Sequence, residues 1–163
     1  MRIVPLDDQH DRTDFASGVE PLDRYFRTQA GQDARKRVAS CFVLIDDDPL
    51  APVGFYTLAA TSLALGDLPQ TLAKRLPRYP VVPATLMGRL AIEARHRRRG
   101  LGQLMLMDAF SRSLRSEIAT FAFVVDAKDD DAASFYASQG FLPLTADGCR
   151  MFVSMAEVAK LFA

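Results

Sequence analysis

The chain has 163 residues, 49% of them hydrophobic, and its twenty basic and twenty acidic side chains give a formal net charge of zero. A chain of this length suits a single domain over residues 1–163 that buries about two thirds of its unfolded surface. Such a domain needs no disulfides or structural metal ions for stability. The zero net charge argues against a generally cationic nucleic-acid binder, although basic residues can still gather on one part of the surface.

The cysteines and the apolar runs indicate where the protein works. Cys41 and Cys149 have no metal-ligand spacing and form no disulfide framework, which is typical of a reducing compartment. His10 and His96 belong to no cluster of metal-ligating residue types, so we predict no metal site. No apolar run approaches the roughly 20 residues of a membrane span, and the first residues lack the apolar core of a signal peptide. We therefore expect a cytoplasmic protein that does not enter a membrane.

The first part of the chain predicts a strand, a helix and a hairpin. Residues 2–6 are a candidate edge strand, and Pro21 opens a helix. The apolar residues of that helix recur with the period of one helix face: Leu22, Tyr25, Phe26 and Ala30. Residues 38–45 and 53–61 are rich in β-branched and aromatic types and flank a turn of aspartates and prolines, which predicts a hairpin.

The middle of the chain predicts a strand and a helix joined by a basic turn. A short helix is expected over residues 68–76, and three prolines then impose an extended or looped passage: Pro77, Pro80 and Pro83. Residues 86–92 form an apolar strand. The next helix begins at about Gly102, and its apolar residues form a wide stripe: Leu101, Leu104, Met105, Phe110 and Leu114.

The last part of the chain completes a mixed sheet. Residues 119–127 are a near-continuous apolar strand, as expected when both faces of a strand are covered. Residues 130–139 predict a helix that ends at Gly140. Residues 150–155 add a strand, and residues 156–162 add a terminal turn of helix. Strands that alternate with helices on an otherwise antiparallel sheet predict an α+β fold, a mixed α/β sheet flanked by helices.

The basic turn carries the first chemical signal, and we call residues 97–102 the arginine turn. Its residues are three consecutive arginines and two glycines around a leucine: Arg97, Arg98, Arg99, Gly100, Leu101 and Gly102. A strand that enters a helix through such a turn leaves backbone N–H groups unpaired where the helix dipole favours an anion. The glycines allow close approach of a pyrophosphate, and the arginines add positive charge. An ordinary solvated loop before a helix is the alternative interpretation.

The arginine turn has the spacing Q/R-x-x-G-x-G/A, with Arg97 in first place. Here the chain resembles the GNAT superfamily of N-acetyltransferases, whose acetyl-CoA pyrophosphate lies on that loop. A second stretch resembles the superfamily pattern N-x-x-A-x-x-F-Y-x-x-x-G-F, through Asp129, Ala132, Phe135, Tyr136, Gly140 and Phe141. Asp129 stands where the pattern has Asn, which affects one polar contact at the pantetheine end of the cofactor. The two motifs agree in order and spacing, and the resemblance implies the GNAT fold and acetyl-CoA as cofactor.

The resemblance also implies roles for individual residues. Those expected to bind acetyl-CoA are Leu90, Ala91, Ile92, Arg97, Arg98, Arg99, Gly100, Leu101, Gly102, Asp129, Ala132 and Phe135. Tyr136 is the candidate general acid, because a phenol with a pKa of about 10 still carries its proton at neutral pH and can protonate the leaving thiolate. A backbone N–H of residues 90–92 is expected to meet the developing oxyanion, where this strand splays from its parallel neighbour over 121–126. Glu93 could relay protons through water, but we expect a solvated loop carboxylate.

The resemblance narrows to the GNAT toxins of bacterial toxin–antitoxin pairs. It extends over F-x-x-G-x-x-x-L-D from Phe15 to Asp23, G-F-Y-T-L-A from Gly54, the proline-containing segment 76–92, and V-D-A before the second motif. These toxins acetylate the amino group of aminoacyl-tRNA and so stop translation, and a ribbon-helix-helix antitoxin neutralises them. The resemblance therefore implies aminoacyl-tRNA as acceptor and such an antitoxin as partner. Because the superfamily often dimerises, it also implies a homodimer.

A tRNA acceptor would need cations that position its phosphates. The candidates are Arg89, Lys74, Arg75 and Arg78. The alternative is an internal ion pair for Arg89 and ordinary surface positions for the other three. Two further functions stay open at this point: an N-acetyltransferase for a small amine or a protein amino group, and a non-catalytic module that binds acyl-CoA or a partner.

Overall fold

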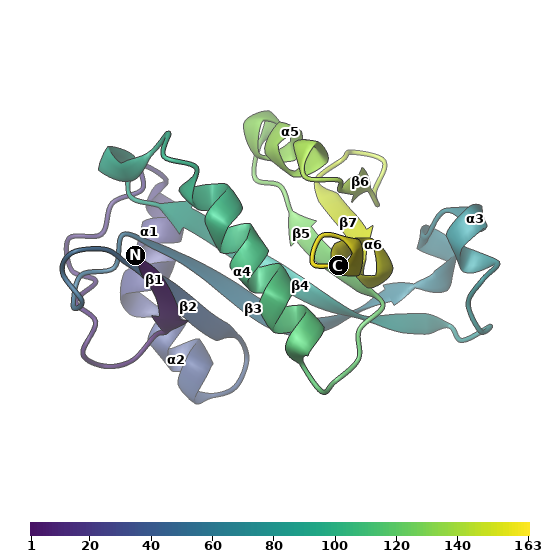
Figure 1. Cartoon of the computed structure of the whole chain (residues 1–163), viewed down its shortest axis with the longest axis horizontal. Coiled ribbons are helices and arrows are strands. Elements are labelled where there is room, and N and C mark those ends of the chain that lie inside the picture. Colours follow the sequence, from purple (N-terminus) through teal and green to yellow (C-terminus); the bar gives the residue numbers. More distant parts are fainter. The chain divides into compact units, whose positions relative to one another are not determined.

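The computed structural model describes residues 1–163, and Figure 1 traces its elements along the chain. The strands are β1 (Arg2–Pro5), β2 (Ser40–Ile45), β3 (Gly54–Ala64), β4 (Val81–Ile92), β5 (Ala122–Asp126), β6 (Leu142–Pro143) and β7 (Arg150–Ser154). The α-helices are α1 (Glu20–Thr28), α2 (Ala30–Arg35), α3 (Gln70–Ala73), α4 (Leu101–Arg115), α5 (Asp130–Ser138) and α6 (Met155–Lys160). Two 3-10 helices are η1 (Leu65–Asp67) and η2 (Ala94–His96). None of the helices is long and apolar enough to span a membrane.

The seven strands are hydrogen-bonded in the order β1-β2-β3-β4-β5-β7-β6. β4 and β5 pair in parallel, whereas β1–β2, β2–β3, β5–β7 and β6–β7 pair antiparallel. This mixed sheet with its helices confirms the predicted α+β class. Contacts divide the chain into two compact units, the first with Met1–Ala59 and Gly88–Ser111, the second with Ala60–Met87 and Arg112–Ala163. The description of the chain as one domain over residues 1–163 stays a prediction.

In the first unit, α1 and α2 lie on one face of β2 and β3, and α4 lies on the other (Figure 1). Alternate residues of these strands point to opposite faces. Toward α1 and α2, Phe55 stacks on Phe26 with ring centroids 4.2 Å apart, within a core of buried apolar side chains. Toward α4, the Tyr56 hydroxyl donates to the Asp108 carboxylate at 2.6 Å. A Cβ at Gly54 would lie 3.0 Å from Met105 Sδ, so the glycine lets α4 pack closely on the strand. The helix that follows the arginine turn is therefore held firmly against β3.

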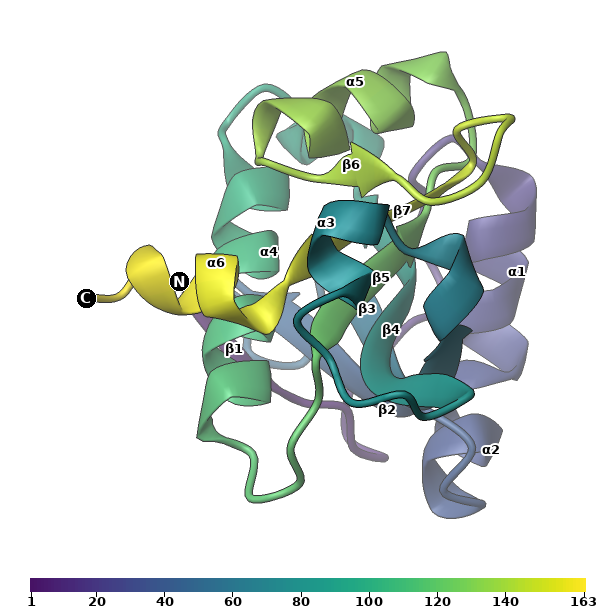
Figure 2. The ribbon, with the colours of Figure 1, turned by 90° about the vertical axis from the view of Figure 1, so that its right-hand side faces the viewer.

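In the second unit, the same alternation divides the residues of β5. Ala122 and Val124 belong to an apolar cluster with Phe152 of β7 and with leucines around α3. Phe123 instead meets Phe141, with ring centroids 6.2 Å apart. Figure 2 shows α5 alongside β6, the short strand that follows it in the chain. The second motif thus lies on a helix whose C-terminal residues are fixed by aromatic packing.

Several predicted elements are confirmed with shifted ends. The hairpin of β2 and β3 is present, and Gly140 follows α5 with a φ of +98°. β4 starts at Val81 and includes Pro83, where an extended or looped passage was predicted. A proline lacks an N–H but keeps its carbonyl, and Pro83 O accepts from Phe121 N at 2.8 Å. The prolines therefore shape the start of a strand rather than interrupt it.

Other predictions about the helices were wrong in detail. The helix expected over 68–76 is limited to α3, and the helix opened by Pro21 breaks at Gln29 into α1 and α2. Leu104, placed on the buried stripe of α4, is 45% exposed. The buried face consists instead of Leu101, Met105, Leu106, Ala109 and Phe110. Because the stripe was read from hydrophobicity alone, it included a residue that borders this face.

Candidate active site

The arginine turn joins η2 to α4 in the first unit. Arg98 and Gly100 adopt left-handed backbone, with φ of 62° and 72°. Gly100 O accepts from Leu104 N at 3.1 Å and so closes the first turn of α4. The N–H groups of the three residues between them have no acceptor within the helix. A Cβ at Gly100 would meet nothing within 4 Å, so this helix start is open to an anion.

The three arginines of the turn have different surroundings. The Arg97 guanidinium donates to the Ser17 carbonyl in the loop before α1. Arg99 Nη1 lies 3.5 Å from the Asp46 carboxylate. Arg98 is exposed, and no hydrogen bond or ion pair within the protein holds its guanidinium. Arg98 is therefore the arginine whose charge is available to a ligand, whereas Arg97 and Arg99 fix the turn itself.

The strand that leads to the turn contains Arg89 and the three residues predicted to border the acyl group. Ala91 is buried, and Leu90 and Ile92 are half-buried. The Arg89 guanidinium lies 3.6 Å from the centroid of the Tyr25 ring. Arg89 is half-buried and is held against the Tyr25 ring by a cation–π contact, where the alternative interpretation expected an ion pair.

The partner ring of Arg89 is itself fixed. The Tyr25 hydroxyl donates to Asp33 at 2.8 Å. Burial, followed by this hydrogen bond, raises the pKa of Tyr25 above its ordinary value. Tyr25 is therefore neutral at physiological pH and presents an uncharged ring to the guanidinium.

Glu93 does not have the solvated position that the sequence suggested. Its side chain is buried, and its backbone N–H donates to Val53 O at 2.9 Å, which fixes the residue immediately after β4. Arg95 covers the carboxylate, with Nε 2.9 Å from one oxygen and Nη2 3.3 Å from the other. The expectation of a solvated carboxylate was wrong, because backbone pairing with Val53 directs the side chain inward. The spacing of an acid and an arginine two residues apart was the only signal for this pair in the sequence.

Tyr136 lies in the second turn of α5, in the second unit. Its ring packs against Phe135 and Phe141, with centroids 5.3 and 5.4 Å away, and the residue is 6% exposed. The hydroxyl has no hydrogen-bond partner within the protein. Because no fully buried polar side-chain atom lacks a partner, this oxygen must be in contact with solvent. Burial raises the pKa of Tyr136 above its ordinary value, and the Asp126 carboxylate pushes it the same way. The phenol therefore keeps its proton at neutral pH while its oxygen stays accessible.

The start of α5 uses two other residues of the second motif. Asp129 is the N-cap, and its carboxylate accepts from Ala132 N at 2.8 Å. Asp and Asn cap helices about equally well, so the departure from the superfamily's Asn preserves this hydrogen bond. Phe135, one residue before Tyr136, is half-buried. Asp129 and Ala132 thus have a structural contact of their own beside any contact with a cofactor.

The remaining predicted cations follow α3, which ends at Ala73, in the second unit. Lys74, Arg75 and Arg78 are exposed, and none of them forms an ion pair. Within the first unit the structure brings together Arg89, residues 90–92 and the arginine turn. Tyr136, Asp129, Ala132 and Phe135 belong to the second unit. The sequence did not reveal the contacts that Arg89 and Arg97 make with Tyr25 and Ser17.

Comparison with known proteins identifies the family. Residues 67–149 match the family model described as FR47-like protein. Over 158 residues the chain is 33% identical to a tRNA-acetylating toxin of Mycobacterium tuberculosis, covering 96% of this chain and 93% of that one. The chain belongs to the FR47-like family of GNAT acetyltransferases. This FR47-like protein is also 27% identical to a probable toxin TacT of Sinorhizobium fredii, over 98% of its own length and 93% of that protein's.

Solved structures of GNAT toxins have the same fold as this FR47-like protein. AtaT complexed with acetyl-methionyl-tRNAfMet is 26% identical, with a TM-score of 0.89 and 99% of both chains covered. AtaTR bound with AcCoA is also 26% identical, with a TM-score of 0.83 over 99% of this chain and 98% of that one. An AtaT mutant bound to the C-terminus of the antitoxin AtaR is 24% identical, with a TM-score of 0.82 over 99% and 98% of the two chains.

Proposed function

We propose that this protein transfers the acetyl group of acetyl-CoA to the amino group of aminoacyl-tRNA and thereby blocks translation. The observation that carries the proposal is the 33% identity, over 96% of the chain, to a tRNA-acetylating toxin. AtaT, a structural relative, was solved with acetyl-methionyl-tRNAfMet, the product of such a reaction. Charged tRNA is a cytoplasmic substrate, which agrees with the predicted compartment.

The arginine turn is assigned to the pyrophosphate of acetyl-CoA. Free N–H groups at the start of α4, the unpaired guanidinium of Arg98 and the open space at Gly100 all fit an anion of that size. Arg97 and Arg99 hold the turn in shape through Ser17 and Asp46. The other residues assigned to the cofactor keep the roles that the motifs imply: Leu90, Ala91, Ile92, Leu101, Gly102, Asp129, Ala132 and Phe135.

Tyr136 is assigned as the general acid. When bound, acetyl-CoA supplies a thioester whose carbonyl carbon is attacked by a neutral amine. As the C–N bond forms and the C–S bond breaks, the Tyr136 hydroxyl gives its proton to the departing sulfur. The amine loses a proton to water, and the phenolate regains one from water. A simple thiol has a pKa of about 8.5, below that of the Tyr136 phenol, so cleavage of the C–S bond drives the proton transfer and reprotonation of the phenolate completes it.

The amine needs little help to lose its proton. An α-amino group has a pKa of about 7.7 to 8.0, so a useful fraction is neutral at physiological pH. Glu93 is not assigned as a base, because Arg95 engages both of its carboxylate oxygens. A backbone N–H of residues 90–92 is assigned to the charge that develops on the carbonyl oxygen.

Lys74, Arg75 and Arg78 are assigned to the phosphates of the tRNA acceptor. All three are exposed and carry no competing ion pair, so their charges are available to an RNA backbone. Arg89 is assigned to the same substrate with a smaller electrostatic role, since Tyr25 holds its guanidinium. The sequence's neutral total charge is compatible with such a local cluster.

Two partners complete the proposal. A ribbon-helix-helix antitoxin would neutralise the enzyme, as expected from the resemblance and from AtaT, which was solved with the C-terminus of its antitoxin AtaR. A homodimer is the proposed assembly, and sedimentation of the purified chain tests it directly.

The deciding experiment uses radiolabelled acetyl-CoA and total tRNA that is either charged or stripped of its amino acids. Label that appears only on charged tRNA, and that disappears in the Tyr136→Phe variant, supports the proposal. Label on neither RNA, with coenzyme A binding intact, contradicts the acceptor assignment and favours a small amine or a protein amino group. A small amine and a protein with a free amino group can then be tested as acceptors in the same assay.

A further inference from the structure

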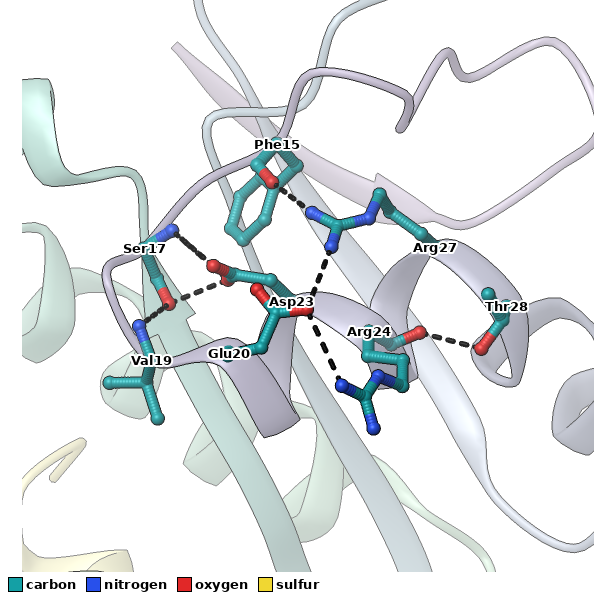
Figure 3. Close-up of polar contacts among 8 residues, drawn as sticks. All are labelled: Phe15, Ser17, Val19, Glu20, Asp23, Arg24, Arg27 and Thr28. Carbon is teal, nitrogen blue, oxygen red and sulfur yellow. Dashed lines mark hydrogen bonds and ion pairs between the residues drawn. The ribbon is translucent and has the colours of Figure 1, made fainter.

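The N-terminal motif F-x-x-G-x-x-x-L-D ends in a buried acid that the reaction does not use. Asp23, in α1, and Ser17, in the loop before it, point toward one another (Figure 3). Each of the two residues is 3% exposed. The Asp23 carboxylate accepts from the Ser17 hydroxyl at 2.6 Å and from the Ser17 N–H at 3.0 and 3.1 Å. Ser17 Oγ in turn accepts from Val19 N at 3.2 Å. A single carboxylate thus fixes the backbone of this loop.

The opposite side of the loop contacts the approach to the arginine turn. The Ser17 carbonyl accepts from the Arg97 guanidinium, and the Ala16 carbonyl accepts from Ala94 N at 2.9 Å. Gly18 has a φ of +93°, and a Cβ at Gly18 would lie 2.9 Å from Arg97 Nη2. Residues 16–18 therefore form a cradle whose shape determines where Arg97 can lie.

The N-terminal end of the cradle is fixed by packing. Phe15 is buried edge-on against Phe26 and Phe55, with ring centroids 4.8 and 5.7 Å away. Arg27 Nη1 donates to the Phe15 carbonyl at 2.8 Å (Figure 3). Because Phe15 is fixed on one side and Asp23 on the other, residues 16–18 have little freedom to reorient their carbonyls.

One peptide group links Asp23 to Ala94 through two hydrogen bonds. The peptide between Ala16 and Ser17 gives its N–H to the charged Asp23 carboxylate and its carbonyl to Ala94 N. A peptide whose N–H is bound to an anion is polarised, which makes its carbonyl a stronger acceptor. The charge of Asp23 is therefore transmitted to the residues that precede the arginine turn.

We propose that Asp23 is a positioning residue for acetyl-CoA binding: it fixes residues 16–18, which hold Ala94 and Arg97 and thus set the conformation of the arginine turn. The inference rests on the proposed function, since it takes that turn to be the pyrophosphate site. Asp23 itself touches no substrate. A purely structural acid at the start of α1 would stabilise the helix without affecting the turn.

The first test is Asp23→Asn, measured in two ways. The amide keeps the size of the side chain but removes the charge and one acceptor for Ser17. In the protein without coenzyme, exchange of the Ala94 amide is expected to become about tenfold faster, the equivalent of one hydrogen bond. The Leu104 amide, which closes the turn onto Gly100, should follow in the same direction. The Kd for coenzyme A should rise about tenfold, while kcat at saturating acetyl-CoA changes less than about twofold.

Two further comparisons separate positioning from general destabilisation. In an Arg97→Gln background, Asp23→Asn should raise the Kd for coenzyme A by less than it does in the unmodified protein, because the route through Arg97 is already broken and only the route through Ala94 remains. Gly18→Ala should raise the Kd, whereas Gly148→Ala should not. Gly148 has a comparable φ of +75° but nothing within 4 Å of its Cβ position, so it controls for backbone strain alone. If Asp23→Asn does not fold, Ser17→Ala removes only the hydroxyl contacts and should change exchange and Kd in the same direction.

The outcomes distinguish this inference from the proposed function. Unchanged exchange at Ala94 and Leu104 in a variant that merely melts earlier would overturn the positioning role. Full additivity of Asp23→Asn and Arg97→Gln in the Kd would overturn it as well. If exchange quickens as expected but the unmodified protein binds no coenzyme A, the positioning of the turn stands and the acetyl-CoA assignment fails.

Discussion

In the arginine turn, polar contacts fix a backbone, whereas around Tyr136 apolar rings fix a single polar atom. Arg97 and Arg99 are bound to Ser17 and Asp46, and this leaves N–H groups and the Arg98 guanidinium for a ligand. Tyr136 is held by ring packing, and its hydroxyl has no partner. The arginine turn would thus bind a multiply charged group through several N–H groups and a guanidinium, whereas proton donation by Tyr136 depends on its hydroxyl alone. Substitutions in the two regions should therefore change different kinetic constants.

The largest effect is expected from Tyr136→Phe. The change removes the only atom assigned to proton donation and leaves the ring packing in place, so kcat should fall by about 10² to 10⁴ while the Kd for coenzyme A stays the same. Tyr79→Phe is the matched control, because Tyr79 is 63% exposed and the proposed reaction does not involve it. Steady-state kinetics on charged tRNA measure both variants. An undiminished kcat in Tyr136→Phe would remove this residue from the mechanism.

The pH dependence of the activity also tests the role of Tyr136. Activity should rise a few tens-fold between about pH 6 and 8 as the acceptor amine loses its proton. The pKa of Tyr136 is raised by burial and by Asp126, so the acid stays protonated and no falling limb should appear at or below its ordinary value of 10. A decline in kcat centred near pH 9 would show that the essential acid has a lower pKa than Tyr136.

Arg98→Ala tests the ligand-binding side. Loss of a charge-assisted contact should raise the Kd for coenzyme A by about tenfold or more, with kcat at saturation unchanged. Arg99→Ala is the comparison variant, and its smaller expected effect follows from the half-exposed pair with Asp46 that it removes. Calorimetric titration with coenzyme A gives both values. Equal losses in the two variants would mean that the turn binds its ligand through summed charge rather than through one free guanidinium.

The sequence located both regions but not the contacts that distinguish them. Spacing alone placed the arginine turn before α4 and the second motif on α5, because glycines, a cap and periodic apolar residues are local signals. The partner of Arg97 is Ser17, eighty positions away, and no local pattern could reveal it. Glu93 was expected in solvent for the same reason, since its burial depends on pairing with Val53. Local chemistry is thus visible in the sequence, while the assignment of each charge to a partner requires the fold.

The exposed cations after α3 are assigned to a third task, binding of the tRNA acceptor. Substituting Lys74, Arg75 or Arg78 by Ala should raise the KM for charged tRNA a few-fold, and each should lessen the slope of log affinity against log salt by about 0.7 to 0.9. Acetylation of a small amine, if any occurs, should not respond. Kinetics at several salt concentrations provide the measurement. A slope that stays equal to that of the unmodified protein in all three variants would place the RNA elsewhere on the protein.

The smallest effect is expected at Asp129, where the motif departs from its usual Asn. Asp129→Asn should change the free energy of unfolding by only a few tenths of a kcal/mol, because either side chain can accept from Ala132 N, whereas Asp129→Ala should cost about 0.5 to 2 kcal/mol. Urea denaturation measures both. If the role of Asp129 is confined to the cap, Asp129→Asn should also leave the Kd for acetyl-CoA unchanged. A Kd that improves in Asp129→Asn would instead indicate a direct polar contact with the cofactor, since an amide can donate to a pantetheine carbonyl and a carboxylate cannot.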